Sequence, residues 1–225
     1  MFYRGGEVLF LGSSGVSPIL TSILAVCFLV LGARRLDTVI RLVVFQAILL
    51  AVLTAILGFT KGIGEMVVIA GLTLVIKVGL IPFILMKVVE RIGLSSETRS
   101  YINRKMSFLI AGALVIVSYL ATRQIATTQS YEGREILATA IAILLIGLLV
   151  MMTRKLAVMQ IVGFLLLENG IFLAGVGTTY GMPLVVELGI FLDMLIGVLV
   201  MGILTFRIQS SFATIDTEKL KNLRG

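Results

Sequence analysis

Histidine is absent from this 225-residue sequence, and cysteine occurs only once, as Cys27. One cysteine cannot form a disulfide within the chain, and no zinc or iron–sulfur site made of Cys and His ligands can be assembled. Cys27 lies in the first apolar block, where a free cysteine usually acts as a small buried hydrophobic residue. We therefore expect the chain to hold no metal, no cofactor and no catalytic centre of its own.

Polar stretches long enough for a sizeable soluble domain are also lacking. Hydrophobic residues make up 59% of the chain and the mean hydropathy is +1.13, whereas soluble domains are about 45–50% apolar. Apolar blocks near the ~20-residue length of a membrane-spanning helix recur throughout. The sequence therefore predicts an all-α polytopic membrane protein, with one integral membrane domain over residues 1–225. The net charge of +7 is ascribed to basic cytoplasmic loops and not to nucleic-acid binding.

Apolar windows between charged residues predict seven membrane-spanning helices. With the N-terminus outside, fourteen of the nineteen Lys and Arg residues fall on one face of the membrane and four on the other, while Lys77 lies within it. Because basic residues are enriched in cytoplasmic loops, the C-terminus is predicted to be cytoplasmic. The predicted spans are Pro18–Gly32, Thr38–Phe59, Met66–Met86, Met106–Thr122, Glu135–Met152, Leu156–Thr178 and Pro183–Phe206.

Four ionisable residues fall inside these predicted spans, namely Lys77, Glu168, Glu187 and Asp193. All but Glu187, which is near the outer end of its helix, are predicted near mid-depth. A charge at the bilayer centre costs roughly 2.5–3.5 kcal/mol on an insertion scale, so such groups face protein or water, pair with one another, or are protonated. The pattern predicts a proton or sodium path. A structural pair, such as Lys77 with Glu168, and interfacial snorkelling of Glu187 are the alternatives.

Two local features support the path. Pro82 follows Lys77 by just over one turn and cannot donate a hydrogen bond to the carbonyl of Val78, so we expect a kink or an opened turn beside the lysine. The sixth and seventh predicted helices form an antiparallel hairpin that places Glu168 and Asp193 at nearly the same depth. Without histidine, a proton relay must use carboxylates, Lys77, hydroxyl groups and water.

Several segments resemble a known family. "TLVIKVGLIPFIL" (residues 73–85), "GFLLLENGIFLAG" (163–175), "VVELGIFLDMLIGVLVMGIL" (185–204) and "IDTEKLKNLRG" (215–225) are similar to the E-type membrane subunit of hydrogenase-4 and related energy-converting nickel–iron hydrogenases. Residues 156–225 also resemble the hairpin and cytoplasmic tail of subunit K of respiratory complex I, in which two membrane glutamates serve the proton path. Glu168 matches the first of these glutamates, and Asp193 matches the second with one methylene less.

The resemblance implies a membrane-arm subunit in a prokaryotic cell membrane. Its partners would be antiporter-like and quinone-site-like membrane subunits and a peripheral redox arm that carries the electron chemistry. Lys77, Glu168 and Asp193, with Glu187, would contribute to proton or sodium translocation coupled to electron transfer. A small subunit of a multi-subunit cation/proton antiporter and a structural assembly subunit are the alternatives.

Overall fold

A computed structural model describes residues 5–92, 100–125 and 131–179, together with Ile196, Gly197, Leu199, Val200 and Ile203. Over these residues the chain is helical apart from short connections, and it forms no strand; Ser100 and Arg154 make an isolated antiparallel bridge. Most of the predicted seventh span, including Glu187 and Asp193, lies outside the described residues. The prediction of an all-α protein is confirmed for the part of the chain that the structure covers.

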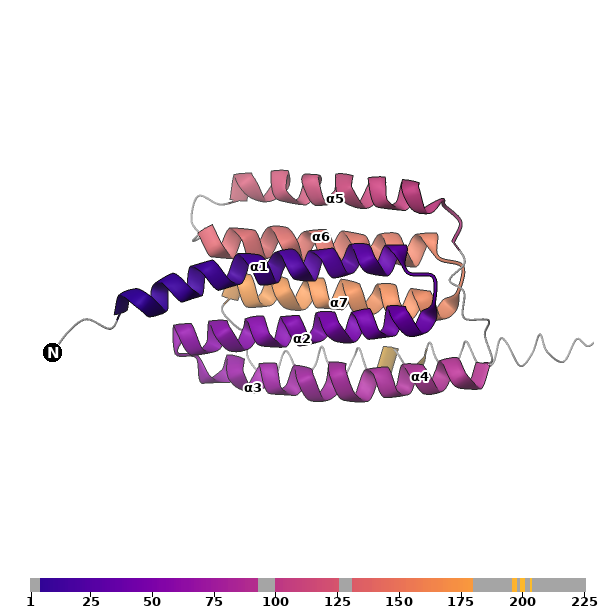
Figure 1. Ribbon diagram of the computed structural model, residues 1–225, viewed down its shortest axis with the longest axis horizontal. Helices are drawn as coiled ribbons and strands as arrows, with labels where there is room; N and C mark the ends of the chain where they lie inside the picture. The colour runs from indigo at the N-terminus through magenta and orange to yellow at the C-terminus, as the bar shows by residue number, and fades with distance from the viewer. Residues whose placement is uncertain are drawn as a thin grey trace, which may run out of the picture.

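The helices run nearly parallel or antiparallel to one another as an elongated bundle (Figure 1). The segment from α3 through the π-helix η1 to α4 is continuous, since the residues at both junctions keep helical dihedral angles. In chain order the elements are α1 (Gly5–Gly32), α2 (Leu36–Lys61), α3 (Gly64–Thr73), η1 (Leu74–Leu80), α4 (Ile81–Ile92), α5 (Arg104–Ile125), α6 (Tyr131–Thr153) and α7 (Ala157–Thr179).

Within the described ranges, six helices are long and apolar enough to cross a membrane. They coincide with the first six predicted spans to within a few residues, and the third consists of α3, η1 and the start of α4. Because lipid offers backbone groups no hydrogen-bond partners, apolar helices of this length are the stable way to cross it. The chain is therefore a multi-pass membrane protein.

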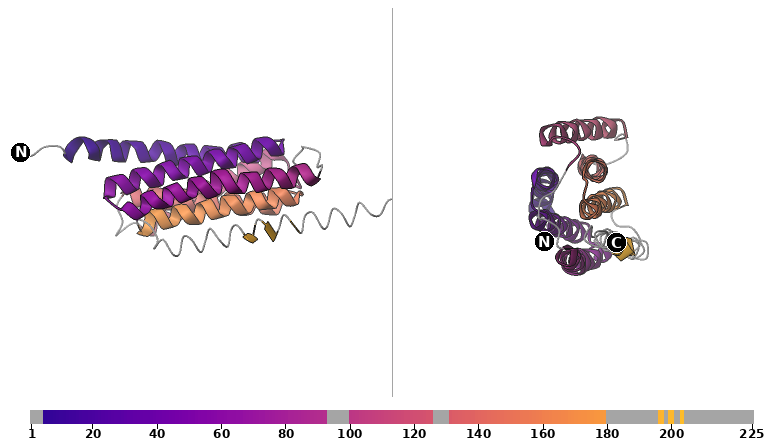
Figure 2. Two further views of the ribbon diagram at one scale, coloured as in Figure 1. Left: turned by 90° about the horizontal axis from the view of Figure 1, so that it is seen from below. Right: turned by 90° about the vertical axis from the view of Figure 1, so that its right-hand side faces the viewer.

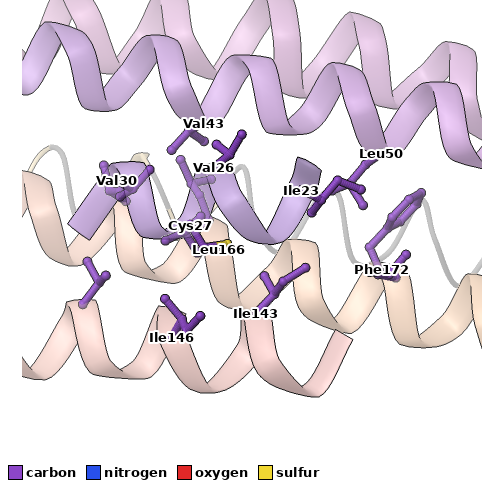
Figure 3. Packing of buried hydrophobic residues seen from close by; sticks show 14 of the residues in the cluster. Ile23, Val26, Cys27, Val30, Val43, Leu50, Ile143, Ile146, Leu166 and Phe172 are labelled. Carbon is purple, nitrogen blue, oxygen red and sulfur yellow. The ribbon is translucent and has the colours of Figure 1, made fainter. Parts of the chain in front are cut away.

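The bundle core lies between α1, α2, α6 and α7. Figure 3 shows Cys27 of α1, Val43 of α2, Ile143 of α6 and Leu166 of α7 pointing into it. The end-on view of Figure 2 places α5 on one side of this core and the α3–α4 segment on the other. Large apolar side chains on the outer helices are exposed, among them Val75 and Leu109, as expected of surfaces that face lipid.

The helices α6 and α7 approach each other at backbone distance. A Cβ atom on Gly147 of α6 would lie 2.6 Å from the backbone nitrogen of Leu167, and one on Gly170 of α7 would lie 2.8 Å from the carbonyl oxygen of Ala140. Small residues allow this close approach in membranes, where van der Waals packing drives helix association. The close contact fixes α7, and hence the side chains that it carries toward α2 and η1.

Candidate functional site

Lys77 lies in the π turn η1. The backbone N–H of Ile81 donates to the carbonyl of Ile76, a bond that skips one residue more than in an α-helix. Pro82 follows directly and has no N–H to offer the carbonyl one α-turn back, so the widened turn forms where a regular hydrogen bond is unavailable. The prediction of an opened turn beside Lys77 is confirmed, and Lys77 is the buried residue of that turn.

The Lys77 ammonium group meets Glu168 across the η1–α7 interface. Nζ of Lys77 lies 2.5 Å from Oε2 of Glu168, and both residues are only 4% exposed. The amide oxygen of Asn169 accepts a second bond from Nζ at 2.8 Å, and the ring of Phe172 lies 4.8 Å from Nζ in a cation–π contact. Residues of one helix, α7, therefore surround the lysine with a carboxylate, an amide oxygen and an aromatic face.

Among the described residues, the Glu168 carboxylate has fewer hydrogen-bond partners than it can accept. Oε1 has no hydrogen-bond partner among the described residues, and Oε2 faces Lys77 as an ion pair without the geometry of a directional hydrogen bond. Buried polar atoms are normally hydrogen-bonded. A cavity of about 10 Å³ adjoins Lys77, Glu168 and Asn169, enough for about one water molecule. Among the described residues, Oε1 is therefore a vacant acceptor, and the cavity beside it has room for a water molecule.

Asn169 continues the polar contacts into the core. Its amide nitrogen donates to Oε1 of Gln46 on α2 at 3.4 Å, and the amide nitrogen of Gln46 donates to Sγ of Cys27 on α1 at 3.1 Å. Cys27 and Gln46 are fully buried. Each donor in the series points away from Lys77, so the contacts set which way the two amide groups face. We call Lys77, Glu168, Asn169, Gln46 and Cys27 the polar chain.

Sequence reasoning found two members of the polar chain and missed the others. Cys27 was expected to be a small buried hydrophobic residue, and it is buried, but it also accepts the bond from Gln46. Gln46 gave a usable signal, because it is an uncharged polar residue within the second predicted span. Asn169 gave a similar signal beside Glu168. Neither signal identifies a partner, because sequence spacing does not tell which helices lie side by side.

Comparison with known proteins gives the family. The chain is 32% identical over 197 residues to Rv0085, an uncharacterized protein of Mycobacterium tuberculosis, which covers 87% of this chain and 90% of the relative. The chain belongs to the same family as that protein. It is also 25% identical over 180 residues to hydrogenase-4 component E of Escherichia coli K12 and of Shigella flexneri, covering 80% of this chain and 83% of each relative. No family model and no solved structure matches the chain.

The distant homology supports the resemblance to hydrogenase-4 component E over most of the chain. The likeness of residues 156–225 to subunit K of complex I stays a prediction. So does the orientation of the termini.

The four residues predicted for the ion path fall into two groups. Lys77 and Glu168 are brought together, whereas Glu187 and Asp193 lie outside the described residues. Within the described ranges, no group of three or more Asp, Glu, Cys or His side chains is placed to hold a metal ion. Among the described residues, the site is therefore an ion pair with amide neighbours.

Proposed function

We propose that this chain is a membrane subunit of an energy-converting hydrogenase-type complex, and that Lys77 and Glu168 form part of its proton or sodium path. The observation that carries the proposal is the buried ion pair at a π turn, in which Oε1 of Glu168 lacks a hydrogen-bond partner among the described residues. Distant homology to hydrogenase-4 component E supports membership of that kind of complex.

In this proposal a proton reaches Oε1 of Glu168 through water in the adjoining cavity. Protonation neutralises the carboxylate and removes the attraction that holds Nζ of Lys77, which is strong in a low-dielectric interior. Asn169 and Phe172 still hold the lysine in place. The lysine charge is then unbalanced, which favours release of a proton to the next acceptor on the path.

We propose Asp193 and Glu187 as later acceptors on the path. The sequence puts Asp193 near the depth of Glu168 on the other arm of the predicted hairpin. The cavity beside the pair is lined by Ile40 and Leu85, which the predicted orientation places toward the cytoplasm. A proton would therefore enter from the cytoplasmic side. Antiporter-like and quinone-site-like subunits would extend the path, and a peripheral redox arm would carry the electron chemistry.

A structural role is the second candidate, because the ion pair itself joins η1 to α7. In that case the pair holds the helices together and takes no part in ion movement. The two candidates agree on assembly and differ on transport, since only the path requires a titratable group at this position. An experiment must therefore measure assembly and ion movement separately.

The first test is Glu168→Gln in the complete complex, isolated from its native membrane and reconstituted into liposomes. We expect the complex to assemble, because the amide has the shape of the carboxylate and still accepts a bond from Lys77, but ion movement per electron-transfer turnover to fall to background. Glu65→Gln is the matched control, because Glu65 is an exposed glutamate at the start of α3. An assembled Glu168→Gln complex that moves ions like the wild type would refute the path.

A further inference from the structure

A groove opens between α1, α5 and α6, away from the Lys77–Glu168 pair. At one end α1 and α5 touch, where the rings of Phe28 and Phe108 stack with centroids 6.1 Å apart. Toward the N-terminal end of α1 the two helices draw apart (Figure 1), and a cavity of about 660 Å³ lies between them over α6. Pockets for small ligands measure roughly 300–1,000 Å³.

Side-chain hydrogen bonds to α6 fix both walls of the groove. The hydroxyl of Ser17 on α1 donates to Oε2 of Glu135 at 2.6 Å, and the hydroxyls of Tyr119 on α5 and Thr139 on α6 lie 3.0 Å apart. Each wall is thus tied to the same floor helix. These hydrogen bonds hold α1 and α5 in place on α6 and keep the space between them open.

The groove lining changes from apolar to charged along its length. Leu24 of α1 and Val115 of α5 line its inner part, while Arg123 of α5 and Arg134 of α6 line its mouth. Val115 lies about two turns before Arg123, which is roughly 12 Å at 1.5 Å per residue. Arg123 is in the last turn of its helix, so the basic mouth sits where the spans end and the apolar part lies at the depth of lipid chains.

We infer that this groove binds one glycerophospholipid molecule, with an acyl chain along the apolar wall and its phosphate at Arg123, which is exposed in the last turn of α5. Guanidinium groups pair with phosphate through charge-assisted hydrogen bonds. The carboxylate of Glu135 also lines the mouth, where it accepts the hydrogen bond from Ser17. An acyl chain supplies the narrow apolar shape that fits between two nearly parallel helices.

A matched pair of substitutions on α1 tests the wall. Thr21 lines the groove and its neighbour Ser22 does not, yet both are exposed and both hydroxyls bond a carbonyl one turn back in α1. Thr21→Trp fills the groove, and Ser22→Trp adds the same indole outside it. The purified full-length chain is delipidated and titrated with dioleoyl phosphatidylglycerol, and native mass spectrometry counts the molecules bound. We expect one tightly held molecule in the wild type and in Ser22→Trp, and none in Thr21→Trp.

The phosphate contact is tested separately from the wall. Arg123→Gln should weaken phosphatidylglycerol binding roughly tenfold or more, as loss of a charge-assisted bond predicts, while Arg41→Gln, an exposed arginine on α2, should leave it unchanged. Dioleoylglycerol, which lacks the phosphate, should bind wild type and Arg123→Gln alike. Equal phosphatidylglycerol binding by wild type, Thr21→Trp and Arg123→Gln would overturn the inference. A helix of another subunit crosslinked at Thr21 in the intact complex would also overturn it.

Discussion

Replacing both members of the buried ion pair with apolar side chains separates an ion path from a structural role. Replacing Glu168 alone with an apolar side chain removes the carboxylate that faces the Lys77 ammonium group, which is buried at 4% exposure. Breaking a buried ion pair in this way costs about 3–5 kcal/mol, whereas replacing the whole pair with well-packed apolar residues is often neutral or stabilising by 1–4 kcal/mol. The double variant Lys77→Met with Glu168→Leu is therefore expected to fold.

The remaining cost comes from Asn169. Its Oδ1 loses the Lys77 donor, and a buried acceptor without a partner costs about 1–3 kcal/mol. This penalty is similar in size to the gain from removing two buried charges, so the net change in stability is expected to be close to zero. Met preserves the approximate length of the lysine and Leu that of the glutamate up to the carboxyl group, which limits the cavity left behind.

The assay compares assembly with ion movement in the same preparation. Native gel electrophoresis of solubilised membranes measures assembly, and liposomes containing the purified complex measure ion movement per electron-transfer turnover. For an ion path, the double variant assembles and transfers electrons but moves fewer ions than the wild type. Wild-type ion movement in an assembled double variant would refute the reasoning and leave the pair with a structural role.

Two further substitutions test the packing around the site. Gln46→Leu removes the partner of the Asn169 amide nitrogen. We expect a loss of about 1–3 kcal/mol of stability, measured as a lower thermal unfolding temperature in detergent. An unchanged unfolding temperature would contradict the hydrogen bonds of the polar chain. Gly147→Ala places a Cβ atom 2.6 Å from the α7 backbone and should cost about 1–3 kcal/mol or more, whereas Gly112→Ala, with nothing within 4 Å, should be neutral or stabilising by up to ~1 kcal/mol. Equal unfolding temperatures for the two alanine variants would disprove the close α6–α7 contact.

The first six spans and the burial of Lys77 and Glu168 were predictable from sequence because they depend on depth. Apolar length sets where a span begins and ends, and counting residues from its ends places a charge near the middle. What the sequence could not supply is rotation about each helix axis. Lys77 meets Glu168 and Asn169 because the π turn and the glycine contacts of α6 with α7 turn these faces together.

The bonds from Asn169 to Gln46 and from Gln46 to Cys27 were unpredictable for a related reason. They join α7 to α2 and α2 to α1, and the sequence gives no order of helices around the bundle. A short connection in the sequence shows only that the two helices it joins are antiparallel neighbours. The contact of α2 with α7, which are far apart in the chain, depends on how all the apolar faces pack together.

Pro82 shows that whether a proline distorts its helix depends on the tertiary contacts around it. Pro18 lies within α1, yet that helix stays α-helical throughout, so a proline alone does not produce a π turn. At Pro82 the turn widens beside Lys77, which reaches Glu168 from that position. The widened turn therefore reflects both the missing N–H and the need to pair a buried ammonium group.

Pro82→Ala tests whether the π turn directs Lys77. The substitution restores an N–H that can bond the carbonyl of Val78, and alanine is about 3 kcal/mol more favourable than proline within a helix. We therefore expect a complex at least as stable as the wild type, with η1 converted to α-helix and Lys77 rotated away from Glu168. Ion movement should fall although no charged group is removed.

Pro18→Ala serves as the matched control, because Pro18 is exposed on α1 and its helix has no π turn to convert. That variant should gain stability without losing ion movement. If Pro82→Ala also keeps wild-type ion movement, the geometry of the turn is irrelevant to transport and Lys77 reaches its partner from a regular helix. If ion movement falls in Pro82→Ala but not in Pro18→Ala, the π turn has a role in directing Lys77 toward Glu168. Both variants replace a proline with an alanine, but only Pro82 follows a π turn.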